Sequence, residues 1–122
     1  MNININSKSA MPIYEQIEQQ IKEEIVSGRL KEGEALPSIR GFASDLKISV
    51  ITIKRAYEDL EKEGLVYSVP GKGVYVDNPD LNYLKEKETL GLEERLDGWI
   101  KDAKNSGMTK EEAASMLDIL WE

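Results

Sequence analysis

Residues 36–76 of this chain read LPSIRGFASDLKISVITIKRAYEDLEKEGLVYSVPGKGVYV, and this stretch decides the fold. Ser38 and Ser49 each stand just before a segment in which apolar residues recur every three or four positions, which is where helix-capping serines are found. Only the dipeptide Lys47-Ile48 separates the two segments. The sequence therefore predicts a short helix, a tight turn and a longer helix that ends at Gly64.

After Gly64 the apolar period falls from about four residues to about two, as expected where strands replace a helix. Residues 65–69 and 74–76 are rich in β-branched and aromatic side chains. The dipeptide Pro70-Gly71 between them suits a type II turn, in which glycine takes a positive φ. Two helices followed by a hairpin form a winged helix-turn-helix, a module that places its second helix in the DNA major groove.

A further helix is predicted before this stretch. It is expected to start at Pro12, because proline is favoured at the first helical position, and to stop at Gly28. A four-residue repeat gives this helix one apolar face, which we expect to be core. The repeat consists of Ile13, Ile17, Ile21 and Ile25.

The tail that begins at Asn78-Pro79 is expected to form two helices, with Gly91 a weak point in the first and residues 105–107 a stop. Thr109 and Glu112 match the capping box that starts the second helix. Two helices of this size cannot bury their apolar side chains alone, and an exposed apolar patch usually marks an interface. We expect dimerisation through Leu92, Leu96, Trp99, Ile100, Ala103, Met116, Leu117, Leu120 and Trp121.

The composition argues against an enzyme. The 122 residues include no Cys and no His, so the chain lacks a thiol nucleophile, a zinc site built on Cys and the commonest general base at neutral pH. Catalysis would then need paired carboxylates, and no Asp or Glu lies in an apolar sequence context that would raise its pKa. We expect no catalytic residue, no metal and no cofactor.

No secretory signal or membrane-spanning run is present in the sequence, which predicts a cytoplasmic protein. The net charge of −7 argues against nucleic acid if the chain is taken whole. The charge is uneven, however, at −2 over residues 1–77 and −5 over residues 78–122. The local distribution of charge therefore decides more than the total.

In the longer helix of the motif, two cations, Lys54 and Arg55, lie toward the N-terminal half, which contacts base edges in helix-turn-helix proteins. Lys54 and Arg55 can reach phosphate or guanine, whereas exposed Val50 or Ile51 can touch a thymine methyl group. The alternative is that both cations form surface ion pairs with the acids four positions on, which are worth only about 0.2–0.5 kcal/mol. The candidate DNA contacts of this helix are Ser49, Val50, Ile51, Thr52, Lys54 and Arg55.

Three further candidates lie on the two elements that flank this helix. Arg40 falls in the first turn of the shorter helix, where a cation opposes the helix dipole at a cost of roughly 0.3–1 kcal/mol. A DNA phosphate at this helix start would favour Arg40, and the alternative is a surface pair with Asp45 or a loop glutamate. Gly71 and Lys72 at the hairpin tip can approach a phosphate or the minor groove, unless the tip is merely solvated.

The chain resembles the GntR family of bacterial transcription regulators. The tail is similar to that of the YtrA subfamily, in which only two dimerising helices follow the winged helix. The residues that carry the resemblance are Pro12-Ile13-Tyr14, Gln16-Ile17, 36–40, 52–60, 63–65, 71–73 and 103–109.

This resemblance implies a homodimer on two inverted half-sites of DNA, with contacts from Arg40, Thr52, Lys54 and Gly71. It also implies a repressor, often of a transporter operon; neither the residues nor the resemblance names a small-molecule effector. The family more often has a polar or basic residue where Val50 and Ile51 stand.

We therefore expect an α+β, mainly α protein. It has a winged helix-turn-helix DNA-binding domain over residues 1–77 and a helical dimerisation tail over residues 78–122. It binds a double-stranded operator and no membrane. A winged-helix module that meets a protein partner through its acidic surface is the alternative from another class.

Overall fold

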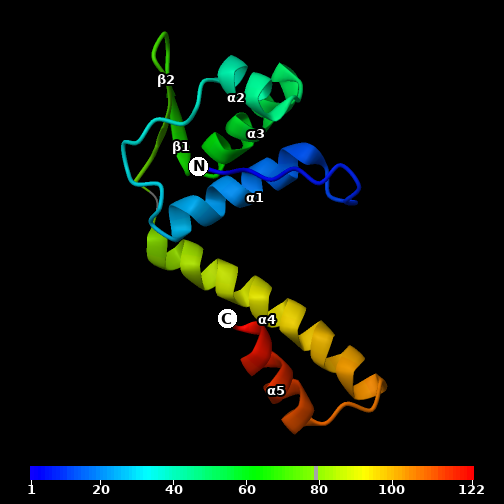
Figure 1. Cartoon of the computed structure of the whole chain (residues 1–122). Helices are drawn as coiled ribbons and strands as arrows, with labels where there is room; N and C mark the ends of the chain where they lie inside the picture. Colours follow the sequence, from blue (N-terminus) through cyan, green and yellow to red (C-terminus); the bar gives the residue numbers. More distant parts are fainter. Residues whose placement is uncertain (79) are drawn as a thin grey trace. The chain divides into compact units, whose positions relative to one another are not determined.

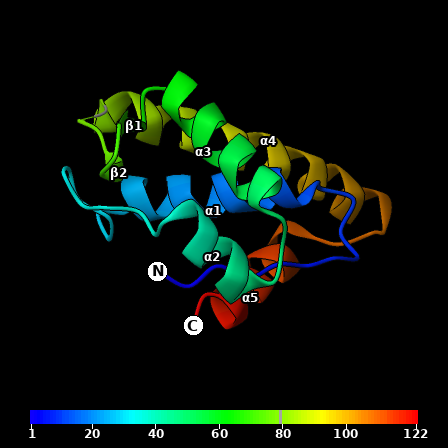
Figure 2. The same cartoon turned by 90° about the horizontal axis from the view of Figure 1, so that it is seen from above.

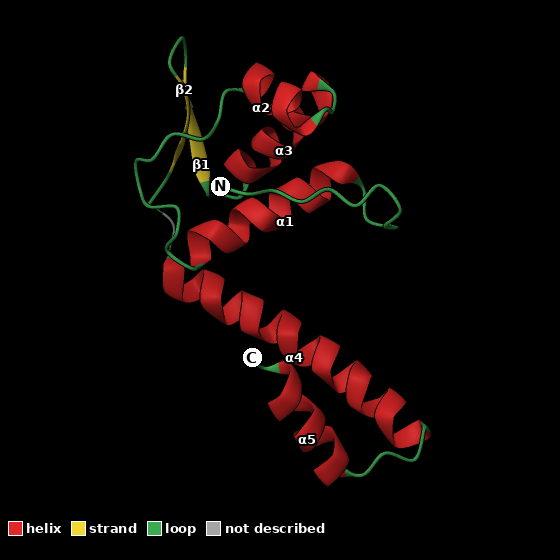
Figure 3. Ribbon diagram, viewed as in Figure 1, coloured by secondary structure: helices red, strands yellow, loops and turns green. Residues whose placement is uncertain are grey.

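The computed structural model describes residues 1–78 and 80–122, and at Leu81 the backbone alone. The described residues form five helices and one two-stranded antiparallel sheet, which confirms the expected mainly α fold class (Figures 1 and 3). The chain divides into two compact units, Met1–Leu81 and Asn82–Glu122. The elements are α1 (Ile13–Val26), α2 (Ile39–Leu46), α3 (Val50–Lys62), β1 (Val66–Val69), β2 (Gly73–Val76), α4 (Leu81–Asn105) and α5 (Lys110–Leu120).

The core of the first unit lies where α1 packs against α3, and Figure 2 shows the two helices side by side. Ile17 and Ile21 of α1 are fully buried, as is Ile53 of α3. The expected apolar stripe of α1 is thus confirmed, except that Ile13 at its start is only half-buried. The helix also begins one residue later than expected, because Pro12 is its N-cap, with an extended ψ of 149°.

The helix-turn-helix forms as its sequence predicts. The Oγ of Ser38 accepts a hydrogen bond from the Gly41 N–H at 3.1 Å, and the Oγ of Ser49 accepts one from the Thr52 N–H at 3.2 Å. Both serines are therefore N-caps. Between the helices Lys47 takes the left-handed conformation at φ 57°, which few residues other than glycine adopt.

The β1–β2 hairpin follows α3, and backbone hydrogen bonds define both its junction with α3 and its turn. Gly64 at φ +79° ends α3, and the Leu65 N–H donates back to the Leu60 carbonyl at 3.0 Å. Gly71 at φ +76° lets the Lys72 N–H reach the Val69 carbonyl at 3.0 Å, which confirms the predicted type II turn. In the loop that precedes α2, Ala35 forms an isolated antiparallel β-bridge with Tyr75 of β2.

The second unit consists of most of α4, and of α5, which turns back from the end of α4 (Figure 3). α4 is continuous through Gly91, and the expected stop after Asn105 is confirmed. The capping box of Thr109 and Glu112 is present with both of its hydrogen bonds. Pro79, at the expected start of the tail, lies outside the described residues. No helix in the described part of the chain has the length and apolar character to span a membrane.

Candidate nucleic-acid interface

Three elements of the first unit gather at one side of it, opposite α1. Figure 1 shows α2, the beginning of α3 and the tip of the β1–β2 hairpin there. These are the elements that a winged helix-turn-helix turns toward DNA: the helix that crosses the backbone, the recognition helix and the wing. The side chains that they expose therefore decide what the surface can bind.

Arg40 is exposed in the first turn of α2. Among the described residues no carboxylate lies within ion-pair distance of it, so the alternative pair with Asp45 does not form. A cation that faces the positive end of a helix without a partner is suited to an anion that bridges the two. Beside it, Gly41 leaves room for the cap, because a Cβ there would lie 2.7 Å from the Ser38 Oγ.

The two basic side chains in the N-terminal half of α3 have partners inside the fold. The Lys54 Nζ lies 3.9 Å from a Glu58 oxygen, and the Arg55 Nε lies 3.9 Å from an Asp59 oxygen. The alternative of surface ion pairs is thus present in the structure, but at this distance and exposure such pairs contribute little and are easily replaced. Arg55 is held further, since its guanidinium lies 3.7 Å from the centre of the Tyr14 ring. Lys54 is therefore the more available of the two cations.

The start of α3 presents apolar surface rather than polar groups. The hydroxyls of Ser49 and Thr52 lie 2.7 Å apart and are bonded to each other. Val50 is 42% exposed and Ile51 is 79% exposed. Large aliphatic side chains thus stand where base-reading residues are usually polar.

The wing is short and braced from α3. Gly71 and Lys72 are exposed at its tip. The Glu61 carboxylate accepts hydrogen bonds from the Ser68 N–H and hydroxyl at 3.1 and 3.0 Å. These bonds fix the first strand to the end of the recognition helix, so the tip projects from a supported base.

The acidic half of α3 serves the fold. Glu63 pairs with Lys22 of α1 at 2.9 Å, while Asp59 faces Glu18 of α1. Burial raises the pKa of Glu18 to about 8, helped by a hydrogen bond to Asp59 and by the negative charges of Asp59, Glu63 and Glu15. The expectation that no acid would have a raised pKa is therefore wrong. Sequence patterns could not reveal it, because the acids that surround Glu18 come largely from a helix far along the chain.

The comparisons with known proteins agree with this geometry. The family described as bacterial regulatory proteins of the gntR family matches residues 13–76, which is more than half of the chain. The chain belongs to the GntR family. GntR proteins are DNA-binding regulators and not enzymes, so the raised pKa of Glu18 is a feature of packing and not of catalysis.

The likeness to individual GntR proteins extends beyond the winged helix. The repressor YtrA from Bacillus subtilis is 37% identical over 109 residues, which cover 89% of this chain and 84% of that protein. A GntR family regulator from Listeria monocytogenes has a similar structure, with a TM-score of 0.73 at 30% identity over 93% of this chain and 98% of its own. The DNA-binding domain of AraR, solved in complex with operator ORR3, matches 62% of this chain and 92% of its own at 29% identity, with a TM-score of 0.53. The resemblance to GntR proteins and to YtrA is thereby confirmed.

The tail of this GntR chain exposes its apolar side chains as expected. No residue of α5 is buried, and Trp121 is 81% exposed. Ala103 is half-buried. The rest of the expected interface is exposed on α4 and on or just after α5, namely Leu92, Leu96, Trp99, Ile100, Met116, Leu117, Leu120 and Trp121.

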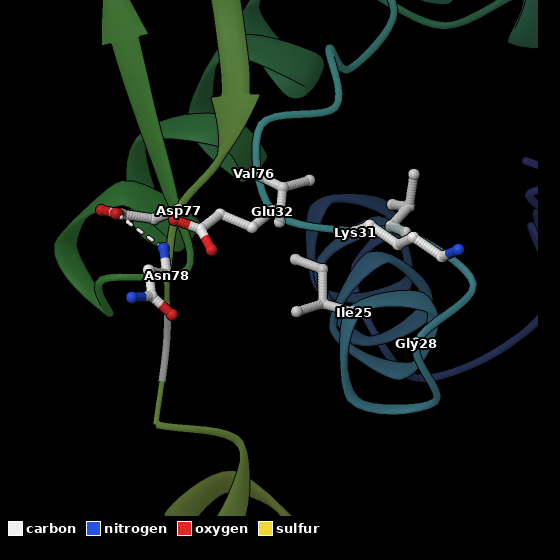
Figure 4. A pocket seen from close by; sticks show the side chains of 8 residues that line it. Ile25, Gly28, Lys31, Glu32, Val76, Asp77 and Asn78 are labelled. Carbon is white, nitrogen blue, oxygen red and sulfur yellow. Dashed lines mark hydrogen bonds between the residues drawn. The ribbon is translucent and has the colours of Figure 1, made fainter.

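A small pocket lies on the first unit of this GntR chain, between the end of α1 and the end of β2 (Figure 4). Its volume is about 230 Å³, below the size of most ligand sites. Charges of both signs, from Lys31, Glu32 and Asp77, surround its apolar residues, which include Ile25 and Val76. We therefore assign it no ligand.

Proposed function

We propose that this chain is a sequence-specific transcriptional repressor that binds an inverted-repeat operator as a homodimer. The observation that carries the proposal is Arg40 at the N-terminus of α2, for which no carboxylate among the described residues lies within ion-pair distance. The helix that carries it lies on the same side of the first unit as the start of α3 and the wing tip (Figure 1). Support comes from the relatives: YtrA is named a repressor, and an AraR domain of similar fold was solved on its operator. By analogy with the family, the regulated genes belong to a transporter operon and the protein acts in the cytoplasm.

The proposed division of labour follows the chain. Residues 1–77 bind DNA: Arg40 holds a phosphate, Lys54 contacts a base or phosphate, and Lys72 with Gly71 approaches the backbone beside the groove. Ser49, Val50, Ile51, Thr52 and Arg55 complete the contact surface of α3. Residues 78–122 join two copies through the exposed apolar side chains of α4 and α5.

A salt titration tests the phosphate role of Arg40. Each phosphate contact adds about one unit to the slope of the logarithm of affinity against the logarithm of salt concentration. We expect Arg40→Ala to weaken binding to every DNA sequence and to lower that slope by about one unit per protomer. Fluorescence anisotropy on labelled duplexes over a range of salt concentrations measures both.

The matched control is Arg29→Ala, which removes the same charge from the loop after α1, where Arg29 pairs with Glu24 at 3.0 Å. This variant should keep the wild-type slope. Equal slopes for Arg40→Ala and the wild type would exclude the phosphate role. Binding of the wild type to no duplex at all would remove the proposed function and favour a protein partner.

A further inference from the structure

The start of α3 exposes apolar surface at Val50 and Ile51. Ile51 lies two positions before the fully buried Ile53, which at 3.6 residues per turn places the two side chains on opposite sides of the helix. Its exposed fraction of 79% confirms that it points away from the core. Val50, 42% exposed, extends this surface by one residue.

The polar side chains of the same turn are already hydrogen-bonded to one another. The Ser49 Oγ accepts from the Thr52 N–H and is bonded to the Thr52 hydroxyl. Arg55 lies on the Tyr14 ring, one turn further along. The aliphatic carbons of Val50 and Ile51 are thus what the first turn offers to a base edge.

The major groove offers one aliphatic group, the C5-methyl of thymine, while its other edge groups are hydrogen-bond donors or acceptors. An aliphatic side chain placed over a donor or acceptor would remove water from it and give nothing in return. From this complementarity we propose that Val50 and Ile51 select thymine in each half-site by contact with its methyl group. The inference rests on the proposed function, since it requires that α3 enters the groove.

The size of the effect follows from the area of one methyl group. Burying one such group changes a binding constant by about fourfold, and a dimer with one contact per half-site doubles the free energy to give about fifteenfold. The contact should therefore be measurable at single thymines.

The test first obtains the operator and then removes only methyl groups. In vitro selection from randomised DNA duplexes with the wild-type protein yields the preferred site. Each thymine of that site is then replaced in turn by deoxyuridine, which lacks the methyl group and keeps every hydrogen-bonding group. We expect one thymine per half-site at which the replacement weakens wild-type binding about fourfold, and other thymines with no effect.

The variants assign the contact to the two side chains. The double variant Val50→Ala/Ile51→Ala should bind thymine and deoxyuridine duplexes equally, and Ile51→Val should keep part of the preference. Because Ile51 is exposed, the single variant Ile51→Ala should have the same midpoint of urea unfolding as the wild type. The wild-type comparison of thymine with deoxyuridine needs no variant, so the proposal stays open to refutation even if the double variant fails to fold.

The outcomes separate this inference from the proposed function. A wild-type protein that selects a site yet tolerates deoxyuridine at every position would overturn methyl readout alone. The same is true if the double variant keeps the full preference for thymine. A wild-type protein that selects no sequence would overturn the proposed function as well.

Discussion

At the scale of single residues, Glu18 shows how a side chain takes its chemistry from the helix packed against it. One of its two carboxyl oxygens, Oε1, is buried, and this oxygen has no hydrogen-bond partner among the described residues. The acids around it are Asp59 of α3, Glu63 just after α3 and Glu15 of its own helix, while the nearby cation Lys22 is paired with Glu63. A protonated Glu18 is therefore favoured in the folded state.

We expect the stability of the wild type to fall between pH 4.5 and about 8 on account of Glu18. Over this range the folded state keeps a proton that the unfolded state has lost, so the free energy of unfolding decreases as the pH rises. Glu18→Gln mimics the protonated acid and should be more stable than the wild type at pH 8 by on the order of 1 kcal/mol, since solvent screens part of the site. The two proteins should be alike near pH 4.

Urea unfolding at several pH values measures this difference. Glu23→Gln is the control, because it removes an exposed acid from the same helix. If Glu23→Gln and Glu18→Gln change the pH dependence equally, the effect comes from net charge and not from the contact with α3.

At the scale of the elements, local signals in the sequence were sufficient for the helices, the turns and the wing. The caps at Ser38 and Ser49, the capping box and the Pro70-Gly71 turn each involve groups within four residues of one another, so their spacing reveals them. The contacts that join elements were not predictable, because they depend on which residues packing brings together. The stacking of Arg55 on Tyr14 and the burial of Glu18 are of this second kind.

The N-terminal arm, residues 1–11, is also held by contacts between elements that the sequence does not reveal. Gln16 of α1 is 8% exposed, and its side-chain amide pairs with both backbone groups of Asn6. Its Oε1 accepts a hydrogen bond from the Asn6 N–H at 2.8 Å, and its Nε2 donates one to the Asn6 carbonyl at 3.0 Å. The same Nε2 donates to the Met11 carbonyl at 2.8 Å. One turn later, Gln20 makes the equivalent pair of bonds with Asn4 at 2.8 Å each.

We expect Gln16→Ala to lower the free energy of unfolding by about 1–3 kcal/mol, because part-buried backbone groups lose their partners. Gln20→Ala is the matched variant, and it should cost less, because its bonds are exposed and water replaces them. Urea unfolding gives the energies, and amide hydrogen exchange at Asn6 reports the arm directly. Equal losses for the two variants would show that burial does not set the strength of these contacts.

At the scale of the whole molecule, charge and apolar surface are divided along the chain. Residues 1–77 carry a net charge of only −2, whereas the tail carries −5 and exposes large apolar side chains. Acidic charge on the tail disfavours DNA there and leaves its apolar surface for another copy. A dimer would present two recognition helices to two half-sites, and the second would then bind at a high effective concentration.

If the proposed dimer forms through one side of α5, a charge placed on that side should break it and a charge on the opposite side should not. Leu117 and Ile119 are both exposed and aliphatic, at 56% and 71%, but they lie about 160° apart around the helix at 3.6 residues per turn. Leu117 belongs to the expected interface and Ile119 does not.

Leu117→Asp should therefore give monomers by size-exclusion chromatography with light scattering, because burying an unpaired charge in the interface is costly. The monomeric variant should also bind operator weakly. Ile119→Asp adds the same charge and should remain dimeric. Dimers of Leu117→Asp, or monomers of both variants, would place the interface elsewhere or extend it around α5.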